Sequence, residues 1–375
     1  MQYKIFKDKK ISALGMGCMR LPVRDGVQSD VDEAAVKAMV DLAMSRGVNY
    51  YDTAWGYHSG KSEVAVGKAL AEYPRESYYL ADKFPGYDLS TFDRKEEVWN
   101  SQFDRTGAEF FDFYMFHNVC ELNIEQYLDP KYGIYDFLMS KKAEGKIKHL
   151  GFSAHGSVSN MKRFLDAYGK DMEFCQLQIN WLDWDFQSAK EKVELLREWG
   201  IPVWVMEPLR GGNLLKFPAE YAEKISAIRP EVSFVELAFR FIQSIPDVVV
   251  TLSGMSNLEQ MADNISIFDE DKPLSEKELG ELLDIAREMT TRGAVPCTAC
   301  RYCTDHCPQG IDIPWMIELY NEHTYSGGGF LAPMAISSLP ENQKPSACLG
   351  CRSCEAVCPQ QIEISKVLSD FAGKL

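Results

Sequence analysis

The feature that most constrains the fold of this 375-residue chain is a regular alternation of short apolar segments with amphipathic helical segments. Such alternation is typical of parallel strands joined by crossover helices. Eight strand–helix units within about 270 residues match a (β/α)8 TIM barrel. The segments that we expect to be strands are residues 14–19, 49–52, 78–83, 112–117, 150–153, 174–180, 202–207 and 247–252.

A doubly wound open sheet is the alternative for the same alternation. Such sheets usually carry a glycine-rich phosphate-binding turn after the first strand. Gly15 and Gly17 lie at the first expected strand, but Arg20 stands where the third glycine of that turn would be. The sequence therefore favours the closed barrel.

Charge and hydropathy restrict the partners of the chain. It has 40 Lys and Arg against 55 Asp and Glu, a formal net charge of −15. An acidic chain has no general attraction for nucleic acid or for an anionic membrane surface. No run of about 18 apolar residues is present to span a bilayer, and the first ten residues lack the apolar core of a secretion signal. We therefore expect a cytoplasmic protein with neither kind of partner.

Cysteine is concentrated near the C-terminus. Eight of the 11 cysteines lie in residues 297–358, whereas Cys18, Cys120 and Cys175 are scattered. A chain of this length needs no disulfides to stabilise its core, and the cytosol keeps thiols reduced. The clustered cysteines are therefore interpreted as metal ligands.

The eight cysteines form two copies of the spacing Cys-x2-Cys-x2-Cys-x3-Cys-Pro. This spacing is typical of two [4Fe–4S] clusters, and the fourth cysteine of each copy commonly binds the other cluster. One cluster would be held by Cys297, Cys300, Cys303 and Cys358, and the other by Cys348, Cys351, Cys354 and Cys307. Two alternatives stay open: an unswapped arrangement, and zinc, although zinc motifs usually come as two Cys-x2-Cys pairs.

The cysteine-rich segment resembles a bacterial-type two-cluster ferredoxin domain. The long stretch between the motifs, residues 308–347, contains an expected helix at 312–321 and indicates a small, mostly helical ferredoxin-like module. A capping box at Ser275–Glu278 begins a helix that Gly293 and Pro296 end. We therefore expect a barrel domain over residues 1–290 and a cluster-binding domain over residues 291–375.

Polar side chains stand at the C-terminal ends of three expected strands. They are Asp52, Lys83 and His117, and Tyr57 follows Asp52 in the next loop. In a parallel barrel these strand ends face one mouth, where active sites lie. We therefore expect the four side chains to converge.

This order of Asp, Tyr, Lys and His resembles the catalytic tetrad of the aldo-keto reductase superfamily. The resemblance implies reduction of a small-molecule carbonyl substrate by NAD(P)H. Tyr57 would be the general acid. Lys83, held charged by Asp52, would lower the pKa of the Tyr57 phenol from about 10. His117 would donate a hydrogen bond to the carbonyl group and orient it.

The resemblance extends to the nucleotide pocket. It implies that the cofactor contacts Ser153, Gln176, Met206, Leu209, Gly211, Gly212, Gly254, Ser256, Gln260 and Asn264. Met206 stands where the family often has an aromatic residue, and Ala154 stands where it usually has Asn. Residues 255–264 contain no Lys or Arg for a 2′-phosphate, which leaves NADH and NADPH open. Arg20 and Arg210 would either bind an anion at the mouth or lie on the surface.

Iron–sulfur clusters in such a reductase leave three interpretations. Clusters pass single electrons, nicotinamide takes a hydride, and flavin can do both. In the first interpretation NAD(P)H reduces a carbonyl and the clusters are structural or sensory. In the second, FMN occupies the barrel and the clusters connect it to a ferredoxin or another electron-transfer protein. In the third, the protein is a non-enzymatic redox-sensing interaction module.

Overall fold

The chain, described over all of residues 1–375 by a computed structural model, divides into two compact units. They are Met1–Ile285 and Ala286–Leu375. The division falls inside helix α12 (Glu276–Thr291), a few residues before the boundary expected at residue 290.

The first unit is a closed barrel of eight parallel strands, which confirms the expected fold and excludes the open sheet. Each expected strand overlaps one that is observed. The strands are β3 (Leu14–Gly17), β4 (Tyr50–Asp52), β5 (Tyr79–Phe84), β6 (Phe111–Val119), β7 (Ile147–Ala154), β8 (Cys175–Gln178), β9 (Val203–Met206) and β10 (Val248–Ser253). They pair in sequence order, and β10 pairs with β3 to close the barrel.

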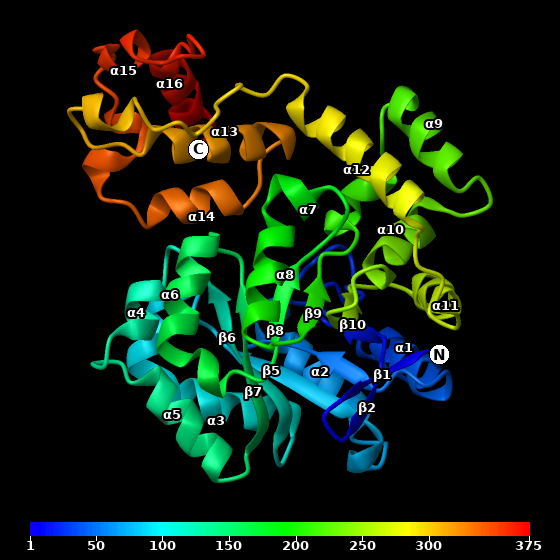
Figure 1. The fold of residues 1–375 in the computed structure, drawn as a ribbon. Helices are drawn as coiled ribbons and strands as arrows, with labels where there is room; N and C mark the ends of the chain where they lie inside the picture. Colours follow the sequence, from blue (N-terminus) through cyan, green and yellow to red (C-terminus); the bar gives the residue numbers. More distant parts are fainter. The chain divides into compact units, whose positions relative to one another are not determined.

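Helices surround the barrel strands (Figure 1). They are α1 (Glu33–Ser45), α2 (Lys61–Leu70), α3 (Lys95–Thr106), α4 (Ile124–Leu128), α5 (Ile134–Ala143), α6 (Val158–Tyr168), α7 (Asp183–Phe186), α8 (Ala189–Glu198), α9 (Ala219–Ile228), α10 (Phe234–Gln243) and α11 (Leu258–Ile267). Several begin at a side chain that accepts a hydrogen bond from an N–H of the first turn, as Asp32, Ser157 and Asn257 do. None of the helices combines the length and apolar character that a membrane span requires.

A short antiparallel hairpin precedes the barrel and was not expected. It consists of β1 (Tyr3–Phe6) and β2 (Lys9–Ser12). Its strands are only four residues long and mix apolar with charged residues, so they are too short to show a clear hydrophobic period. Phe6 and Ile11 nevertheless pack in the same buried cluster as the barrel residues Phe113 and Trp204.

Side-chain direction inside the barrel follows the two-residue period of β-strands. Tyr50, Ala81, Phe113 and Met115 all belong to the buried central cluster. Asp52, Lys83 and His117, which stand two positions after Tyr50, Ala81 and Met115, therefore point inward at the C-terminal mouth. Residues at odd offsets, such as Asp82, point outward to the helices.

The second unit contains helices and irregular loops. Besides the end of α12, its helices are α13 (Ile313–Tyr325), α14 (Leu331–Ser337), α15 (Ser353–Ala356) and α16 (Ile364–Lys374). Met316 and Ile317 of α13 pack with Leu368 and Phe371 of α16 in a small core. The mostly helical character expected for this region is confirmed.

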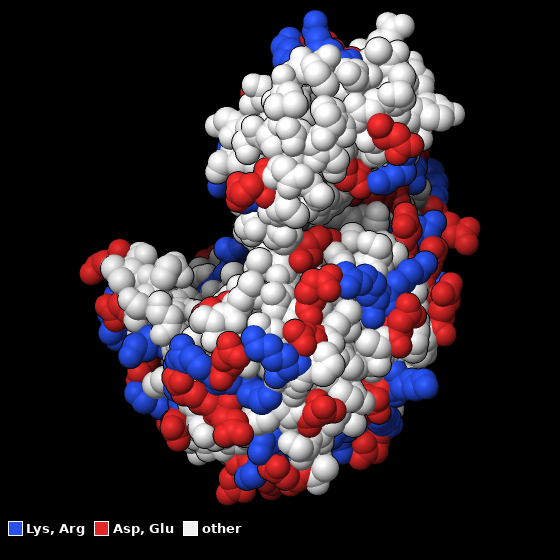
Figure 2. Space-filling view, turned by 90° about the vertical axis from the view of Figure 1, so that its left-hand side faces the viewer, with Lys and Arg blue, Asp and Glu red and all other residues white.

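The acidic excess of the chain is distributed rather than concentrated. Figure 2 shows Lys and Arg interspersed with Asp and Glu over the larger unit, with no extended region of one sign on that face. Many of these charges pair locally, as Lys37 does with Asp41. Such exposed pairs contribute little to stability, so the barrel depends on its apolar interior.

Two helical glycines give a matched test of the packing between α2 and α3. A Cβ atom on Gly67 of α2 would lie within 2.7 Å of the Thr106 Cα atom, whereas a Cβ on Gly280 of α12 would meet nothing. We predict that Gly67→Ala lowers the free energy of unfolding by about 1–3 kcal/mol or more. Gly280→Ala should raise it by about 0.5–1 kcal/mol. Thermal unfolding compares the two, and equal shifts would contradict the packing described.

Candidate functional site

The four polar side chains expected at the mouth are brought together. Lys83 Nζ donates hydrogen bonds to Asp52 Oδ1 at 2.6 Å and to the Thr53 carbonyl oxygen at 2.8 Å. The same ammonium lies 5.1 Å from the centroid of the Tyr57 ring. The Tyr57 and His117 rings meet edge-on with centroids 6.0 Å apart.

The pair of Lys83 and Asp52 is buried, with Lys83 0% and Asp52 3% exposed. Burial alone would lower the pKa of Lys83, but the negative charge of Asp52 raises it above its ordinary value. Burial raises the pKa of Asp52, and Lys83 opposes that rise. The ion pair is the state in which each buried charge has its counter-charge, so the site contains a fixed ammonium.

The pKa values of the Tyr57 and His117 side chains shift in opposite directions, and both shifts favour the neutral form. Lys83 lowers the pKa of Tyr57, as expected, but burial raises it by more. The net pKa lies above the ordinary value, because desolvation of the phenolate exceeds its attraction to the ammonium. The pKa of His117 falls well below 6.5 because of burial and the nearby Lys83. At neutral pH the phenol therefore keeps its proton and the imidazole is uncharged.

His117 also presents an unused polar atom. Its Nδ1 atom is buried and has no hydrogen-bond partner, although a buried polar atom without a partner costs free energy. Tyr87 packs edge-on against the same imidazole, with centroids 5.2 Å apart, and its hydroxyl group is buried and equally without a partner. Tyr87 was not singled out from the sequence, because a loop tyrosine carries no positional pattern. Together the two residues offer unpaired polar atoms to a bound molecule.

The turn that carries Tyr57 is anchored by His58. His58 and Ser59 adopt left-handed backbone conformations, with φ of 52° and 56°. His58 Nε2 accepts a hydrogen bond from the Leu21 N–H group at 3.1 Å, which leaves Nδ1 as the donor to the Gln28 carbonyl oxygen at 2.7 Å. The imidazole therefore fixes a turn that would otherwise be strained.

The residues expected to contact a nucleotide fall into an inner and an outer set. In the inner set, Gln176 Nε2 donates to Asp52 Oδ2 at 3.3 Å, and Ser153 Oγ accepts from the Asn118 N–H group at 2.8 Å. Met206 ends β9. Asn264, also expected to contact the nucleotide, is buried, and its amide donates a hydrogen bond to Ser253 Oγ at 3.0 Å.

The outer set consists of residues that lie around Arg20, namely Gly211, Gly254, Ser256 and Gln260. The side-chain carbons of Arg20 lie 3.1–3.2 Å from the place a Cβ would take on Gly254, and its Nη2 atom 2.9 Å from that place on Gly211. Ser256 Oγ donates to the Arg20 carbonyl oxygen at 2.8 Å, and Gln260 Oε1 accepts from the Ser256 N–H group at 2.8 Å. Arg20 therefore connects the loops after β9 and β10.

The loop after β9 holds the other expected residues. Leu209 precedes Arg210, and Gly211 and Gly212 have φ of 66° and 91°. Arg210 is buried and pairs with Asp183 at 3.1 Å, so the alternative that it lies on the surface is wrong. The ion pair of Arg210 and Asp183 fixes the loop in which Gly211 and Gly212 form the turn.

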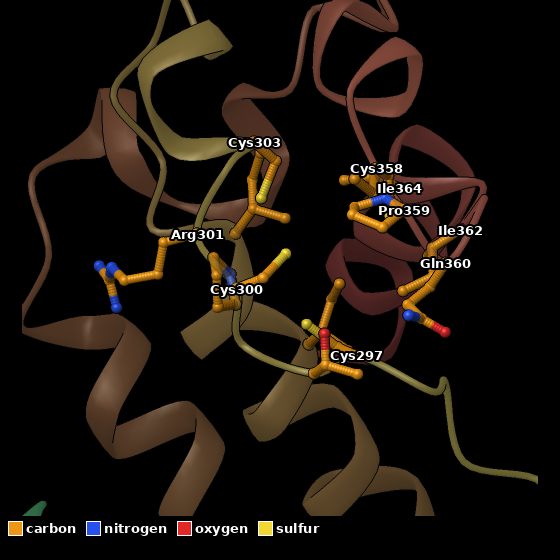
Figure 3. Close-up of a pocket in the computed structure, with 13 residues that line it drawn as sticks. Cys297, Cys300, Arg301, Cys303, Cys358, Pro359, Gln360, Ile362 and Ile364 are labelled. Atoms are coloured by element: carbon orange, nitrogen blue, oxygen red, sulfur yellow. The ribbon is translucent and has the colours of Figure 1, made fainter.

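The cysteines of the second unit surround two cavities. The first is lined by Cys297, Cys300, Cys303 and Cys358, and the second by Cys307, Cys348, Cys351 and Cys354. Figure 3 shows the first three residues on one side of the first cavity and Cys358 with Pro359 on the other. The grouping is the swapped one, in which each motif gives its fourth cysteine to the other cavity.

Equivalent cysteines of the two motifs have equivalent surroundings. The second cysteine of each motif is exposed, the third is buried, and the first and fourth are intermediate. Arg301 and Arg352, which follow the second cysteines, share left-handed backbone conformations with φ of 64° and 60°. Ile313 lines both cavities. The two loops therefore form a matched pair of thiol-lined sites.

Comparison with known proteins agrees with this description of both units. The sequence model of the aldo/keto reductase family matches residues 13–287, and that of a 4Fe-4S dicluster domain matches residues 296–363. A probable aldo-keto reductase from Glycine max is 26% identical over 312 residues, covering 73% of this chain and 85% of the relative. An NADH-specific methylglyoxal reductase from Escherichia coli K12 is 26% identical over 303 residues, covering 69% and 90%.

Solved structures resemble the barrel unit. An aldo-keto reductase from Bacillus halodurans in its holo form has a TM-score of 0.62 at 24% identity, covering 76% of this chain and 96% of that one. An aldo-keto reductase from Klebsiella pneumoniae in complex with NADPH has a TM-score of 0.59 at 17% identity, with the same coverages. At these identities the likeness shows the fold alone.

Proposed function

Because this chain belongs to the aldo/keto reductase family of oxidoreductases, we propose that its barrel reduces a small carbonyl compound with NAD(P)H, with Tyr57 as the proton donor. The observation that carries the proposal is the buried ammonium of Lys83 between Asp52 and the Tyr57 ring. A charge fixed there acts on the phenol without competition from water.

Each residue at the mouth has a stated part in the proposed reaction. Tyr57 holds its proton at neutral pH and gives it to the carbonyl oxygen as negative charge develops there. Lys83 then stabilises the phenolate that remains. His117, being neutral, offers its ring N–H to the same oxygen and orients the carbonyl group. Asp52 keeps Lys83 charged and in place.

The nucleotide would lie across the inner and outer sets. When bound, the nicotinamide supplies the hydride. Gln176 and Ser153, beside the tetrad, would be polar contacts of the nicotinamide. The Arg20 side chain packs against both glycine loops, the one at Gly211 and the one at Gly254. The Arg20 guanidinium is only loosely paired, 3.8 Å from Glu207, so a phosphate group would be a better partner. The NADPH complex of one structural neighbour and the NADH specificity of one relative leave both nucleotides as candidates.

The second unit would hold two [4Fe–4S] clusters in its two cavities. Four thiols around each cavity fit a cluster, and the apolar linings beside them, such as Ile313 and Leu368, limit access of water. The match of residues 296–363 to a 4Fe-4S dicluster domain favours clusters over zinc. We propose that the clusters take no part in hydride transfer and have a structural or sensory role. A step between one-electron and hydride chemistry needs a group such as flavin, and nothing in the structure favours a flavin.

Removal of the phenol hydroxyl tests the proton donor. We predict that Tyr57→Phe lowers the rate of methylglyoxal reduction by NADH or NADPH by about 10²–10⁴-fold and leaves the unfolding temperature nearly unchanged. Tyr221→Phe, which removes a buried hydroxyl without a partner from α9, is the matched control and should keep the full rate. A folded Tyr57→Phe enzyme with the rate of the unmodified protein would refute the assignment.

Paired cysteine variants test the swapped clusters. The intact, anaerobically reconstituted protein should contain about eight iron atoms. Cys303→Ala combined with Cys358→Ala removes ligands from one cavity and should leave about four. Cys303→Ala combined with Cys307→Ala removes ligands from both cavities and should leave almost none. Iron analysis distinguishes these results, Cys120→Ala serves as the control, and the reverse order for the two double variants would establish the unswapped arrangement.

A further inference from the structure

Two buried carboxyl groups that the proposed reaction does not use lie behind the mouth residues. Asp82 precedes Lys83 in β5, and its side chain points outward from the barrel. Glu63 lies in the first turn of α2. Both are 0% exposed. Their hydrogen-bond partners, Gln102 for Asp82 and Arg105 for Glu63, are three residues apart in α3, so they lie on one face of that helix. This brings the two carboxyl groups together, and each shifts the pKa of the other. Two ionised carboxylates without water would repel each other strongly.

Asp82 is bound by neutral donors. Its Oδ1 atom accepts hydrogen bonds from the Lys83 N–H group and from Gln102 Nε2, both at 2.8 Å. Gln102 Nε2 also donates to the Lys83 carbonyl oxygen at 3.0 Å, and Tyr114 Oη donates to Gln102 Oε1 at 2.6 Å. The tyrosine thereby fixes the direction of the glutamine amide, so Oδ1 of Asp82 must remain an acceptor.

Glu63, by contrast, has a cation as its partner. Arg105 of α3 donates from Nη1 to Glu63 Oε2 at 2.8 Å and to the Trp55 carbonyl oxygen at 3.0 Å. Its guanidinium also lies 5.4 Å from the centroid of the Trp55 ring. Trp55 precedes Tyr57 by two residues, so Glu63 is fastened through Arg105 to the loop that carries the proposed proton donor.

One oxygen of each carboxyl group remains without a donor. Glu63 Oε1 and Asp82 Oδ2 are buried, and no N–H or O–H group of the protein reaches them. A single proton between them would satisfy both atoms. It belongs on Asp82, because Glu63 has the guanidinium to stabilise its charge and Asp82 has none in contact.

We propose that Glu63 and Asp82 form an acid–carboxylate pair in which Asp82 Oδ2–H donates to Glu63 Oε1, and that the pair positions the Tyr57 loop against the strand of Lys83. The chain of hydrogen bonds runs from the Trp55 carbonyl oxygen through Arg105, Glu63 and Asp82 to the backbone of Lys83. Both residues are positioning residues, since neither touches the mouth. The positioning part rests on the proposed function, whereas the shared proton does not.

Titration of the pair has a defined direction. Burial, and then the charge of Glu63, raise the pKa of Asp82 well above its ordinary value. The groups that face Asp82 are Glu63 from α2, Gln102 and Arg105 from α3, Tyr114 from β6 and Lys83 on its own strand; burial keeps the Tyr114 phenol protonated by raising its pKa. Folding therefore takes up a proton at Asp82, and the stability of the folded state is lost as pH rises from the unfolded pKa towards the folded pKa.

Isosteric amide variants of the full, cluster-loaded chain test the shared proton. Asp82→Asn keeps the Oδ1 acceptor and replaces Oδ2–H by an N–H donor, so its unfolding temperature at pH 7 should equal or exceed that of the unmodified protein. Glu63→Gln takes the counter-charge from Arg105 and should unfold at least about 4 °C lower. The difference between Asp82→Asn and the unmodified protein should grow with pH from 5 to 8. Equal losses in both variants, or a difference independent of pH, would overturn the proposal.

The positioning role is tested by rescue. With NADH and methylglyoxal, Asp82→Ala should lose at least about tenfold in kcat with a smaller change in KM, since a misplaced group lowers the rate more than binding. Asp82→Asn should restore kcat to within about twofold. An Asp82→Asn variant as slow as Asp82→Ala would refute positioning. If the unmodified protein reduces no carbonyl compound, the proposed function fails, and the unfolding temperatures still decide the shared proton.

Discussion

The ion pair of Lys83 and Asp52 is the interaction on which the candidate active site depends. A lysine that is 0% exposed is stable only with a counter-charge in contact, and Asp52 provides it at 2.6 Å. Loss of one partner of such a pair typically costs about 3–5 kcal/mol. The pair in turn fixes a positive charge beside Tyr57, and the proposed proton transfer from Tyr57 uses that charge.

The closed barrel makes the pair possible. Parallel strands place their C-terminal ends at one mouth, and the two-residue period turns Asp52 and Lys83 inward while Asp82 turns outward to the helices. The same strand therefore carries a charged group into the site and a buried carboxyl group behind it. The second unit is organised differently: its apolar core is small, and thiols surround its two cavities.

Much of this arrangement could be predicted from the sequence, and the reasons for the exceptions are physical. Eight strands, the convergence of Asp52, Tyr57, Lys83 and His117, and the grouping of the cysteines follow from periodicity and spacing. The direction of the Tyr57 pKa does not, because it depends on how deeply the phenol is buried. Arg210 pairs with Asp183, 27 residues away, and Asp82 meets Glu63 only across two elements. Long-range pairing of this kind leaves no pattern in a single sequence.

The source of the new hydrogen tests the central claim most directly. NADH carrying deuterium at both C4 positions would be mixed with methylglyoxal and the protein in ordinary water, and the alcohol product would be examined by mass spectrometry and NMR. The proposed chemistry predicts deuterium on the carbon of whichever carbonyl group of methylglyoxal is reduced. The hydroxyl proton of the product is supplied through Tyr57. Hydrogen from solvent at that carbon would show that electrons reach the substrate by another route and would contradict direct hydride reduction.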